Sequence, residues 1–156
     1  MKPIVLAKNG ETDYNIIVSE SCSPSEDHAA NELRHYLGLV SDAHLNIDDD
    51  RAPQTDKEIL IGKSRHLDHL NLNVDYSRLG DEGFTIKTHL DCLVLCGGRL
   101  RGSMYAVYTF LQRYVGCSWL SSSVSRIPRM NEIALGQIDD IEVPYLEYRD
   151  VHYTDA

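Results

Sequence analysis

Two groups of side chains have the residue types of a metal site. His28, Glu32 and His35 are spaced by four and three residues, so a helix would place all three on one side. Imidazole and carboxylate groups are ordinary zinc ligands, but the apolar residues of this segment lie on a different side, which is typical of solvated polar positions. His66 and His69 form a similar pair, and the zinc-protease motif HExxH does not occur. We predict that neither group binds a metal.

Asp81 and Glu82 are neighbouring acids of the kind found in sugar hydrolases whose substrate contributes its own acetamido group. In such enzymes one carboxyl group orients the acetamido group and the other protonates the leaving oxygen. Here the two acids lie between Gly80 and Gly83, directly before an apolar stretch that begins at Phe84. This position favours a solvated turn, so we predict that neither acid is catalytic.

Residues 97–103, with the sequence GGRLRGS, lie between a predicted strand and a predicted helix, as a phosphate-binding loop does. A Walker motif needs lysine before its serine or threonine, because the ammonium group reaches the outer phosphates. Gly102 occupies that position, and the GxGxxG spacing is also absent. The glycines therefore predict a sharp turn and a close approach of helix to sheet, without a nucleotide or other cofactor. No GxSxG motif supports nucleophilic catalysis either.

Two long helices and one short one are expected from capping signals and apolar spacing. Ser23, Pro24 and Glu26 form a capping box with proline at the first helical position, and apolar residues recur at helical spacing as far as Val40. A second long helix is predicted over residues 101–115, followed by Gly116 as its cap. The short helix is expected at residues 64–70, and residues 43–51, which contain three consecutive aspartates, are expected to form a polar loop.

Alternating or continuous apolar runs bounded by turn residues predict the strands, with a hairpin around residues 89–91. The predicted strands are residues 4–7, 14–19, 58–62, 84–88, 92–96, 132–135 and 146–153. Together with the helices they predict an α+β fold, an α/β sandwich in which two main helices pack on one face of a mixed sheet.

Length and charge exclude several classes of protein. The 156 residues correspond to one domain, and 15 basic against 24 acidic side chains give a net charge of −9, so no nucleic-acid partner is expected. No apolar run reaches the roughly 18–20 residues of a membrane helix, so no membrane partner is expected. The N-terminus lacks the apolar stretch of a signal peptide, which predicts either a cytoplasmic protein or one whose signal was removed. Cys22, Cys92, Cys96 and Cys117 are expected to be reduced and buried.

Five stretches carry a resemblance in combination: HAANELRHYL, EILIG, DEGFTI, LVLCGGRLRGSMYAVYTFLQRYVGCSWL and VPYLEYRDVHY. Together they resemble the N-terminal domain that precedes the catalytic barrel in bacterial α-glucuronidases and β-N-acetylhexosaminidases, and are similar to uncharacterised bacterial proteins of that arrangement. The resemblance extends over residues 4–145. It implies a zincin-like topology, with helices on one side of a sheet, but without the zinc site and without catalysis.

The resemblance also implies a division of the chain. Residues 1–144 would form the accessory domain, and residues 145–156 would begin a (β/α)₈ barrel, which needs about 200 residues or more and is therefore not in this chain. The implied function is a non-catalytic domain that packs on and supports the barrel of a glycoside hydrolase acting on polysaccharides or oligosaccharides. In the hexosaminidases the catalytic Asp-Glu pair lies inside the barrel. An α-glucuronidase and a hexosaminidase remain equally open as the parent enzyme.

Arg149 is the one residue to which the resemblance gives a role in substrate binding. Hexosaminidases hold the terminal sugar with an arginine at the end of the first barrel strand, in an Arg-Gly motif. Arg149 matches that arginine by position, but Asp150 replaces the glycine. The alternative is a strand-end arginine that pairs with a neighbouring acid.

An independent carbohydrate-binding module is the alternative function. Trp119 and nine tyrosines are the side-chain types that stack on sugars, although Tyr105, Tyr108 and Tyr114 have the spacing of helix packing residues. Residues 143–153 are rich in apolar and aromatic side chains and would form a strand without barrel partners. We expect this segment to be disordered, folded back on its domain, or paired with a second copy of the chain.

Overall fold

The structure is a computed structural model that describes residues 3–145. The strand expected at residues 146–153, the role of Arg149 and most of the expected self-association segment lie outside the described residues. Among residues 3–145, no helix combines the length and the apolar character required to cross a membrane.

Six strands form one mixed sheet in the order β10-β5-β6-β4-β2-β3. Their bounds are β2 (Asn15–Val18), β3 (Asn46–Asp49), β4 (Glu58–Ile61), β5 (Phe84–His89), β6 (Cys92–Gly97) and β10 (Asp139–Glu142). Strands β3, β2, β4 and β6 run parallel, whereas β5 is antiparallel to both of its neighbours. Every strand except β5 therefore ends at the same edge of the sheet, which we call the carboxyl edge.

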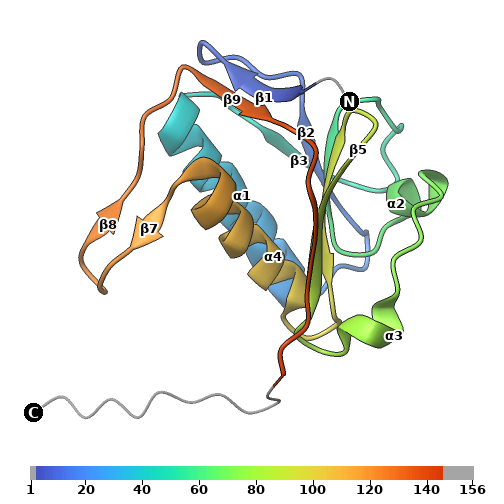
Figure 1. Cartoon of the computed structure of the whole chain (residues 1–156). Coiled ribbons are helices and arrows are strands. Elements are labelled where there is room, and N and C mark those ends of the chain that lie inside the picture. Colours follow the sequence, from blue (N-terminus) through green and yellow to red (C-terminus); the bar gives the residue numbers. More distant parts are fainter. Residues whose placement is uncertain (1–2, 146–156) are drawn as a thin grey trace, which may run out of the picture.

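Two helices cover one face of this sheet: α1 (Pro24–Ser41) and α4 (Gly102–Phe110), which continues into a π-helical turn, η1 (Leu111–Val115) (Figure 1). The predicted capping box of α1 is confirmed, because the Ser23 hydroxyl accepts the N–H of Glu26 and the Ser23 N–H donates to the Glu26 carboxylate. Gly116 ends η1 at φ = 85°. The predicted α+β sandwich with two main helices on one face is confirmed.

The opposite face of the sheet carries two shorter helices, α2 (Arg65–His69) and α3 (Tyr76–Leu79) (Figure 1). The central strands β4 and β6 are buried at every position, which explains their nearly continuous apolar sequences. The main core lies between the sheet and the long helices. A smaller cluster lies between the sheet and α2. It consists of Ile17, Leu60, Leu67, Val94 and Cys96.

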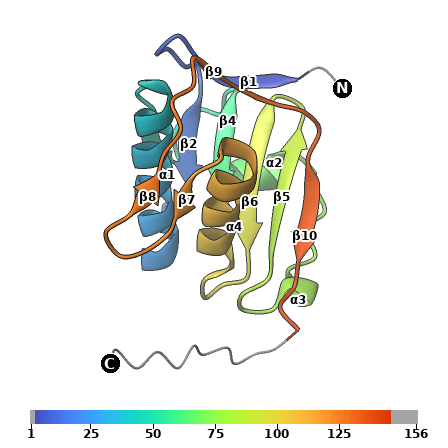
Figure 2. The same ribbon diagram turned by 60° about the vertical axis from the view of Figure 1, so that its left-hand side comes forward.

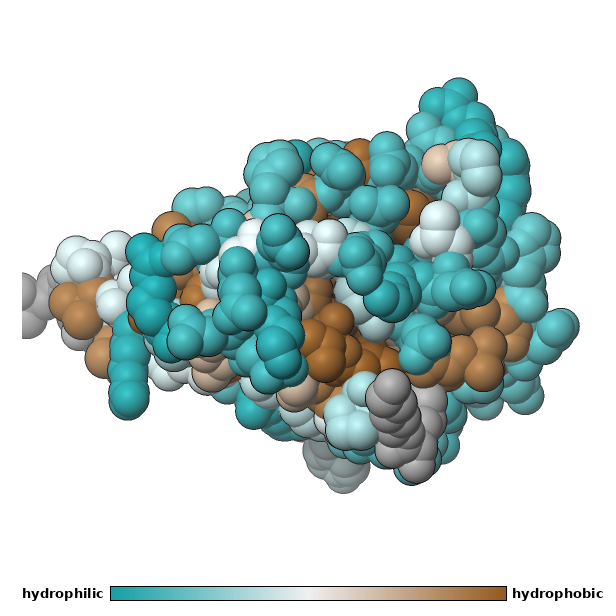
Figure 3. All heavy atoms as spheres, turned by 90° about the horizontal axis from the view of Figure 1, so that it is seen from above, coloured by the Kyte–Doolittle hydropathy of each residue, from teal (hydrophilic) through white to brown (hydrophobic). Residues whose placement is uncertain are grey.

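A two-stranded ladder crosses the edge opposite the carboxyl edge, which we call the amino edge (Figure 2). It pairs β1 (Ile4–Lys8) with β9 (Glu132–Leu135) in antiparallel orientation. Viewed from this edge, the surface is mainly hydrophilic, with apolar side chains between the polar ones (Figure 3). A small hairpin, β7 (Ser118–Trp119) and β8 (Ser125–Arg126), projects beside the long helices.

The expected polar loop at residues 43–51 is wrong in part, because β3 pairs in parallel with β2. Its sequence, NIDD, has one apolar residue, and its burial alternates between exposed and half-buried, as suits an edge strand. Strand β10, with the sequence DDIE, was missed for the same reason. Each of these strands is defined by pairing with a strand that is distant in sequence, and local sequence patterns do not reveal such a partner.

The close approach predicted for residues 97–103 is confirmed at Gly97. A Cβ atom there would lie 2.6 Å from the carbonyl oxygen of Gly83, so the backbone would have to move. We expect Gly97→Ala to lower the free energy of unfolding by about 1–3 kcal/mol in urea denaturation. The matched control is Gly136→Ala, whose added methyl group meets nothing within 4 Å. This control should change stability by less than about 0.5 kcal/mol, and equal losses would contradict the packing explanation.

Candidate functional site

A cleft of about 670 Å³ opens at the carboxyl edge of the sheet. The loops that follow β2, β4 and β6 meet there, together with the first turn of α1. This is the usual location of ligand sites in open α/β sheets. The lining includes Ser23, Glu26, Lys63, Tyr76, Gly98 and Arg99. The cleft is therefore the candidate ligand site of the domain.

The Glu26 carboxylate fills the place beside the N-terminus of α1. One of its oxygens accepts hydrogen bonds from the N–H and the hydroxyl of Ser23, at 2.9 and 3.0 Å, and the other accepts from the Ser103 hydroxyl at 3.3 Å. A Cβ atom on Gly62 would collide with this carboxylate. Helix N-termini attract anions, and here the chain provides its own. Glu26 thus takes the position that a bound phosphate would need.

Asp50 lies on another side of the cleft and joins three segments of backbone. One oxygen of its buried carboxylate accepts from the Glu20 N–H at 2.9 Å and the other from the Arg65 N–H at 2.8 Å. Burial opposes ionisation, but the two N–H donors and the Arg65 guanidinium hold the pKa of Asp50 below its ordinary value. The expectation that Asp50 belongs to a solvated loop is wrong. The run of three consecutive aspartates does not indicate which of the three carboxylates is buried.

Asp50→Asn should lower the free energy of unfolding by about 1–3 kcal/mol at pH 7, because it replaces a charged acceptor of two backbone N–H groups. The folded-state pKa of Asp50 is lowered, so its ionised form stabilises the fold above the ordinary value of 3.8. That contribution is lost as the pH falls through the folded-state pKa. Urea denaturation at several pH values should show the difference between wild type and variant shrinking below pH 3.8.

Asp48→Asn is the matched control for this prediction, because Asp48 lies two residues before Asp50, on β3, with an exposed side chain. It should change stability by less than about 0.5 kcal/mol at pH 7. A difference between wild type and Asp50→Asn that is independent of pH would contradict the role given to the charge.

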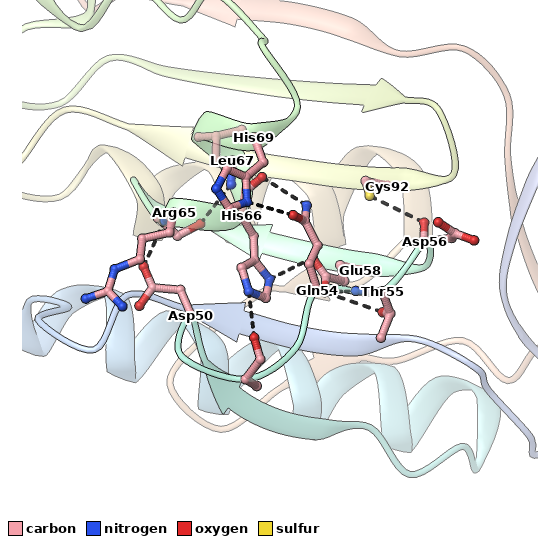
Figure 4. A network of polar contacts seen from close by, with 12 residues as sticks. Asp50, Gln54, Thr55, Asp56, Glu58, Arg65, His66, Leu67, His69 and Cys92 are labelled. Carbon is pink, nitrogen blue, oxygen red and sulfur yellow. Dashed lines mark hydrogen bonds and ion pairs between the residues drawn. The ribbon is translucent and has the colours of Figure 1, made fainter.

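A buried Glu–His pair lies between the start of β4 and α2 (Figure 4). Nδ1 of His66 is 3.0 Å from the Glu58 carboxylate and Nε2 is 3.0 Å from the Ala52 carbonyl oxygen; the two side chains are 3% and 1% exposed. The other Glu58 oxygen accepts from the Thr55 N–H at 2.8 Å. Each ring nitrogen of His66 thus faces an oxygen of the protein. The pair thus fastens the chain between β3 and β4 onto α2.

His69, on the same short helix, has a different partner from His66. Its Nδ1 is 3.0 Å from the Gln54 side-chain oxygen, while the Gln54 amide donates to the His66 carbonyl oxygen at 3.1 Å (Figure 4). The spacing of the two histidines did not reveal the pairing of His66 with Glu58. A charged residue at the start of the buried run EILIG was the one available signal.

His66→Ala should lower the free energy of unfolding by about 3–5 kcal/mol, because it leaves the Glu58 carboxylate buried without its partner. The control is His69→Ala on the same helix, where the side chain is exposed. This control should cost less than about 0.5 kcal/mol. Chemical denaturation of both variants checks the prediction, and comparable losses would show that loss of helical structure, and not loss of the buried pair, is the cause.

Two of the other metal candidates, Glu32 and His35, contact aromatic side chains. Glu32 accepts a hydrogen bond from the Tyr108 hydroxyl at 2.8 Å, and the ring of His35 packs edge-on against Tyr36. Glu32 thus contacts α4, although the sequence analysis placed it on a purely solvated side. Within residues 3–145, no group of three or more His, Cys, Asp or Glu side chains is arranged to hold a metal ion.

The acid pair that resembles a hydrolase motif lies in the turn before β5, as expected. The Glu82 carboxylate pairs with the Arg101 guanidinium at 2.6 Å. The Asp81 carbonyl oxygen accepts the N–H groups of Leu100 and Arg101, at 3.3 and 3.2 Å. Both residues therefore connect this turn to the loop between β6 and α4.

Trp119 packs with two tyrosines of the long helices. Its indole N–H donates to the Tyr36 hydroxyl at 2.9 Å, and its ring makes edge-to-face contacts with Tyr36 and Tyr108, with ring centroids 5.1 and 5.3 Å apart. Tyr105 and Tyr114 pack against the core, which confirms their predicted packing role. The aromatic side chains thus fasten the β7–β8 hairpin to the helices.

The four cysteines are free, and three of them are buried as predicted. Cys22 is half-buried, which corrects the expectation for that residue. Burial raises the pKa of Cys96 to about 12, so its thiol is protonated and unreactive at neutral pH.

Comparison with known proteins decides the family. The family model described as "Glycosyl hydrolase family 67 N-terminus" matches residues 6–110, more than half of the chain. The chain belongs to this family. The matched residues include the capping box of α1, the buried strand β4, the β5–β6 hairpin and α4. The resemblance recognised in the sequence, to an N-terminal domain of glycoside hydrolases, is thereby confirmed. A search of curated protein sequences found none that matches.

Two solved structures are similar to this family 67 N-terminal domain. The family GH115 4-O-methyl-α-glucuronidase BtGH115A, described as specific for decorated arabinogalactans, has 19% sequence identity and a TM-score of 0.71 over 93% of this chain. The chain spans 19% of the length of that structure, and the likeness shows a shared fold. CpGH84D has 14% identity and a TM-score of 0.47, and the match covers 68% of this chain and 17% of that one.

Proposed function

We propose that this family 67 N-terminal domain is a non-catalytic accessory domain of a glycoside hydrolase, and that it packs on and supports a catalytic (β/α)₈ barrel in the parent polypeptide. The family match over residues 6–110 is the observation that carries this proposal. A barrel needs about 200 residues, which a chain of 156 residues cannot provide beside this domain. The proposed substrates of the parent are polysaccharides or oligosaccharides.

The arrangement of the acids supports an accessory role. Glu26 caps α1, Asp50 binds two backbone N–H groups, and Glu58 pairs with His66. A catalytic carboxyl group needs access to the atoms that react, whereas these carboxylates are occupied by the protein's own donors. The acids of the domain thus hold loops in place.

An α-glucuronide is the substrate class that we favour for the parent enzyme. Family 67 supplies the matching N-terminal domain, and the similar GH115 structure is that of a 4-O-methyl-α-glucuronidase. Substrate binding by Arg149, the boundary at residue 144 and a cytoplasmic location stay predictions that accompany this proposal.

Assays of the parent polypeptide and of the 156-residue chain with aryl α-glucuronides and aryl N-acetylhexosaminides test the function. The parent should hydrolyse a glycoside, and the isolated chain should not. The parent with Asp81→Asn should keep full activity, since Asp81 contributes its backbone carbonyl to a turn. Turnover by the isolated chain after repeated purification, or a parent without glycosidase activity, would contradict the proposal.

Isothermal titration calorimetry of the isolated chain with xylo- and chito-oligosaccharides tests the alternative of a carbohydrate-binding module. We expect no heat of binding. Binding with a Kd below about 1 mM that is lost in Trp119→Ala would instead establish the domain as a binding module. Tyr145→Ala is the control, because Tyr145 is exposed and lies in the segment after β10.

A further inference from the structure

The amino and carboxyl edges of the sheet are covered unequally. The β1–β9 ladder crosses the amino edge, where the Tyr14 hydroxyl also donates to the Asp91 carbonyl oxygen at 2.8 Å (Figure 2). Among residues 3–145, no strand ladder crosses the carboxyl edge, which contains the 670 Å³ cleft. The carboxyl edge is therefore the more open end of the domain.

The chain leaves the domain at this open edge. Glu142, the last residue of β10, pairs with Phe84, which in turn pairs with Gly97 of the cleft lining. Strand β10 therefore ends level with the cleft, and the chain continues from there through Tyr145 (Figure 1). Whatever follows this domain in the polypeptide is attached at the carboxyl edge.

Large apolar side chains are exposed where the chain leaves. Leu100 is 56% exposed, Val143 45% and Tyr145 99%. Leu100 belongs to the loop between β6 and α4, and its N–H donates to Asp81, in the turn that leads into β5. This loop and the outgoing chain thus both lie at the carboxyl edge, and we call these three side chains the exit patch.

Charge at the cleft rim adds a second feature to this surface. Lys63 and Arg99 are exposed there, and neither has an ion pair with the described residues. Interfaces between linked domains usually bury about 600–1,500 Å², more than three side chains supply, so the cleft rim must contribute to an interface at this edge. A matching surface would present apolar side chains to the exit patch and carboxylates to the two cations.

Exposed apolar side chains alone do not identify the docking surface, because the amino edge also has them. Leu90, in the turn between β5 and β6, is 63% exposed. The attachment of the outgoing chain distinguishes the two edges, since a domain joined directly after β10 starts beside the exit patch. We propose that the carboxyl edge, comprising the exit patch and the rim of the cleft, is the docking surface for the catalytic domain of the parent polypeptide. This inference rests on the proposed function.

Cysteine labelling of the parent polypeptide tests the docking surface. Leu100→Cys and its matched control Leu90→Cys are compared in a Cys22→Ser background, with maleimide modification followed by peptide mass spectrometry. In the isolated 156-residue chain both new thiols should react at similar rates. In the parent, Cys at position 100 should react about tenfold more slowly, because the interface must open first, while position 90 keeps its rate. Equal rates at the two positions in the parent would overturn the inference.

Oxidative footprinting of the unsubstituted parent avoids any effect of the substitutions on docking. Leu100 and Tyr145 should be protected relative to the isolated chain, and Leu90 should not. Glycosidase activity is measured on the same preparations. An active parent with an unprotected exit patch overturns the docking surface and leaves the proposed function standing. A parent without glycosidase activity overturns the proposed function itself.

Discussion

The close contact of two turns is the constraint on which the rest of this domain depends. The backbone at Gly97, Gly98 and Gly102 lies directly on the turn formed by residues 80–83, and the Gly98 N–H donates to the Gly83 carbonyl oxygen at 2.7 Å. No side chain larger than hydrogen fits between these backbones. The contact fixes where α4 begins over the sheet and forms one wall of the cleft, so helix packing and the carboxyl edge have a common origin.

Three acidic side chains of this domain stabilise its loops. Glu26, Asp50 and Glu58 each accept two or more hydrogen bonds from the protein. Glu26 and Asp50 connect segments that are distant in sequence, whereas Glu58 connects the start of β4 to the loop before it and to α2. A buried carboxylate is costly without such partners, so these acids also specify which loops meet. These carboxylates are therefore explained by the loops that they hold together.

Local signals predicted the elements that local interactions define. The capping box at Ser23, the β5–β6 hairpin and the glycines before α4 were all read from the sequence, because each depends on neighbouring residues. Strands β3 and β10 were missed because partners far along the chain determine them. The cleft and the Glu58–His66 pair were missed too, since they form only when separate strands and helices come together.

The ladder between β1 and β9 also affects how the domain folds during its synthesis. Ile4 pairs with Leu135, so β1 is synthesised about 130 residues before the strand with which it pairs. Until then Ile4 and Leu6, both buried in the finished fold, have no strand to pair with. Contacts so distant in sequence slow folding and leave nascent chains open to aggregation. Completion of the domain is thereby coupled to synthesis of β9.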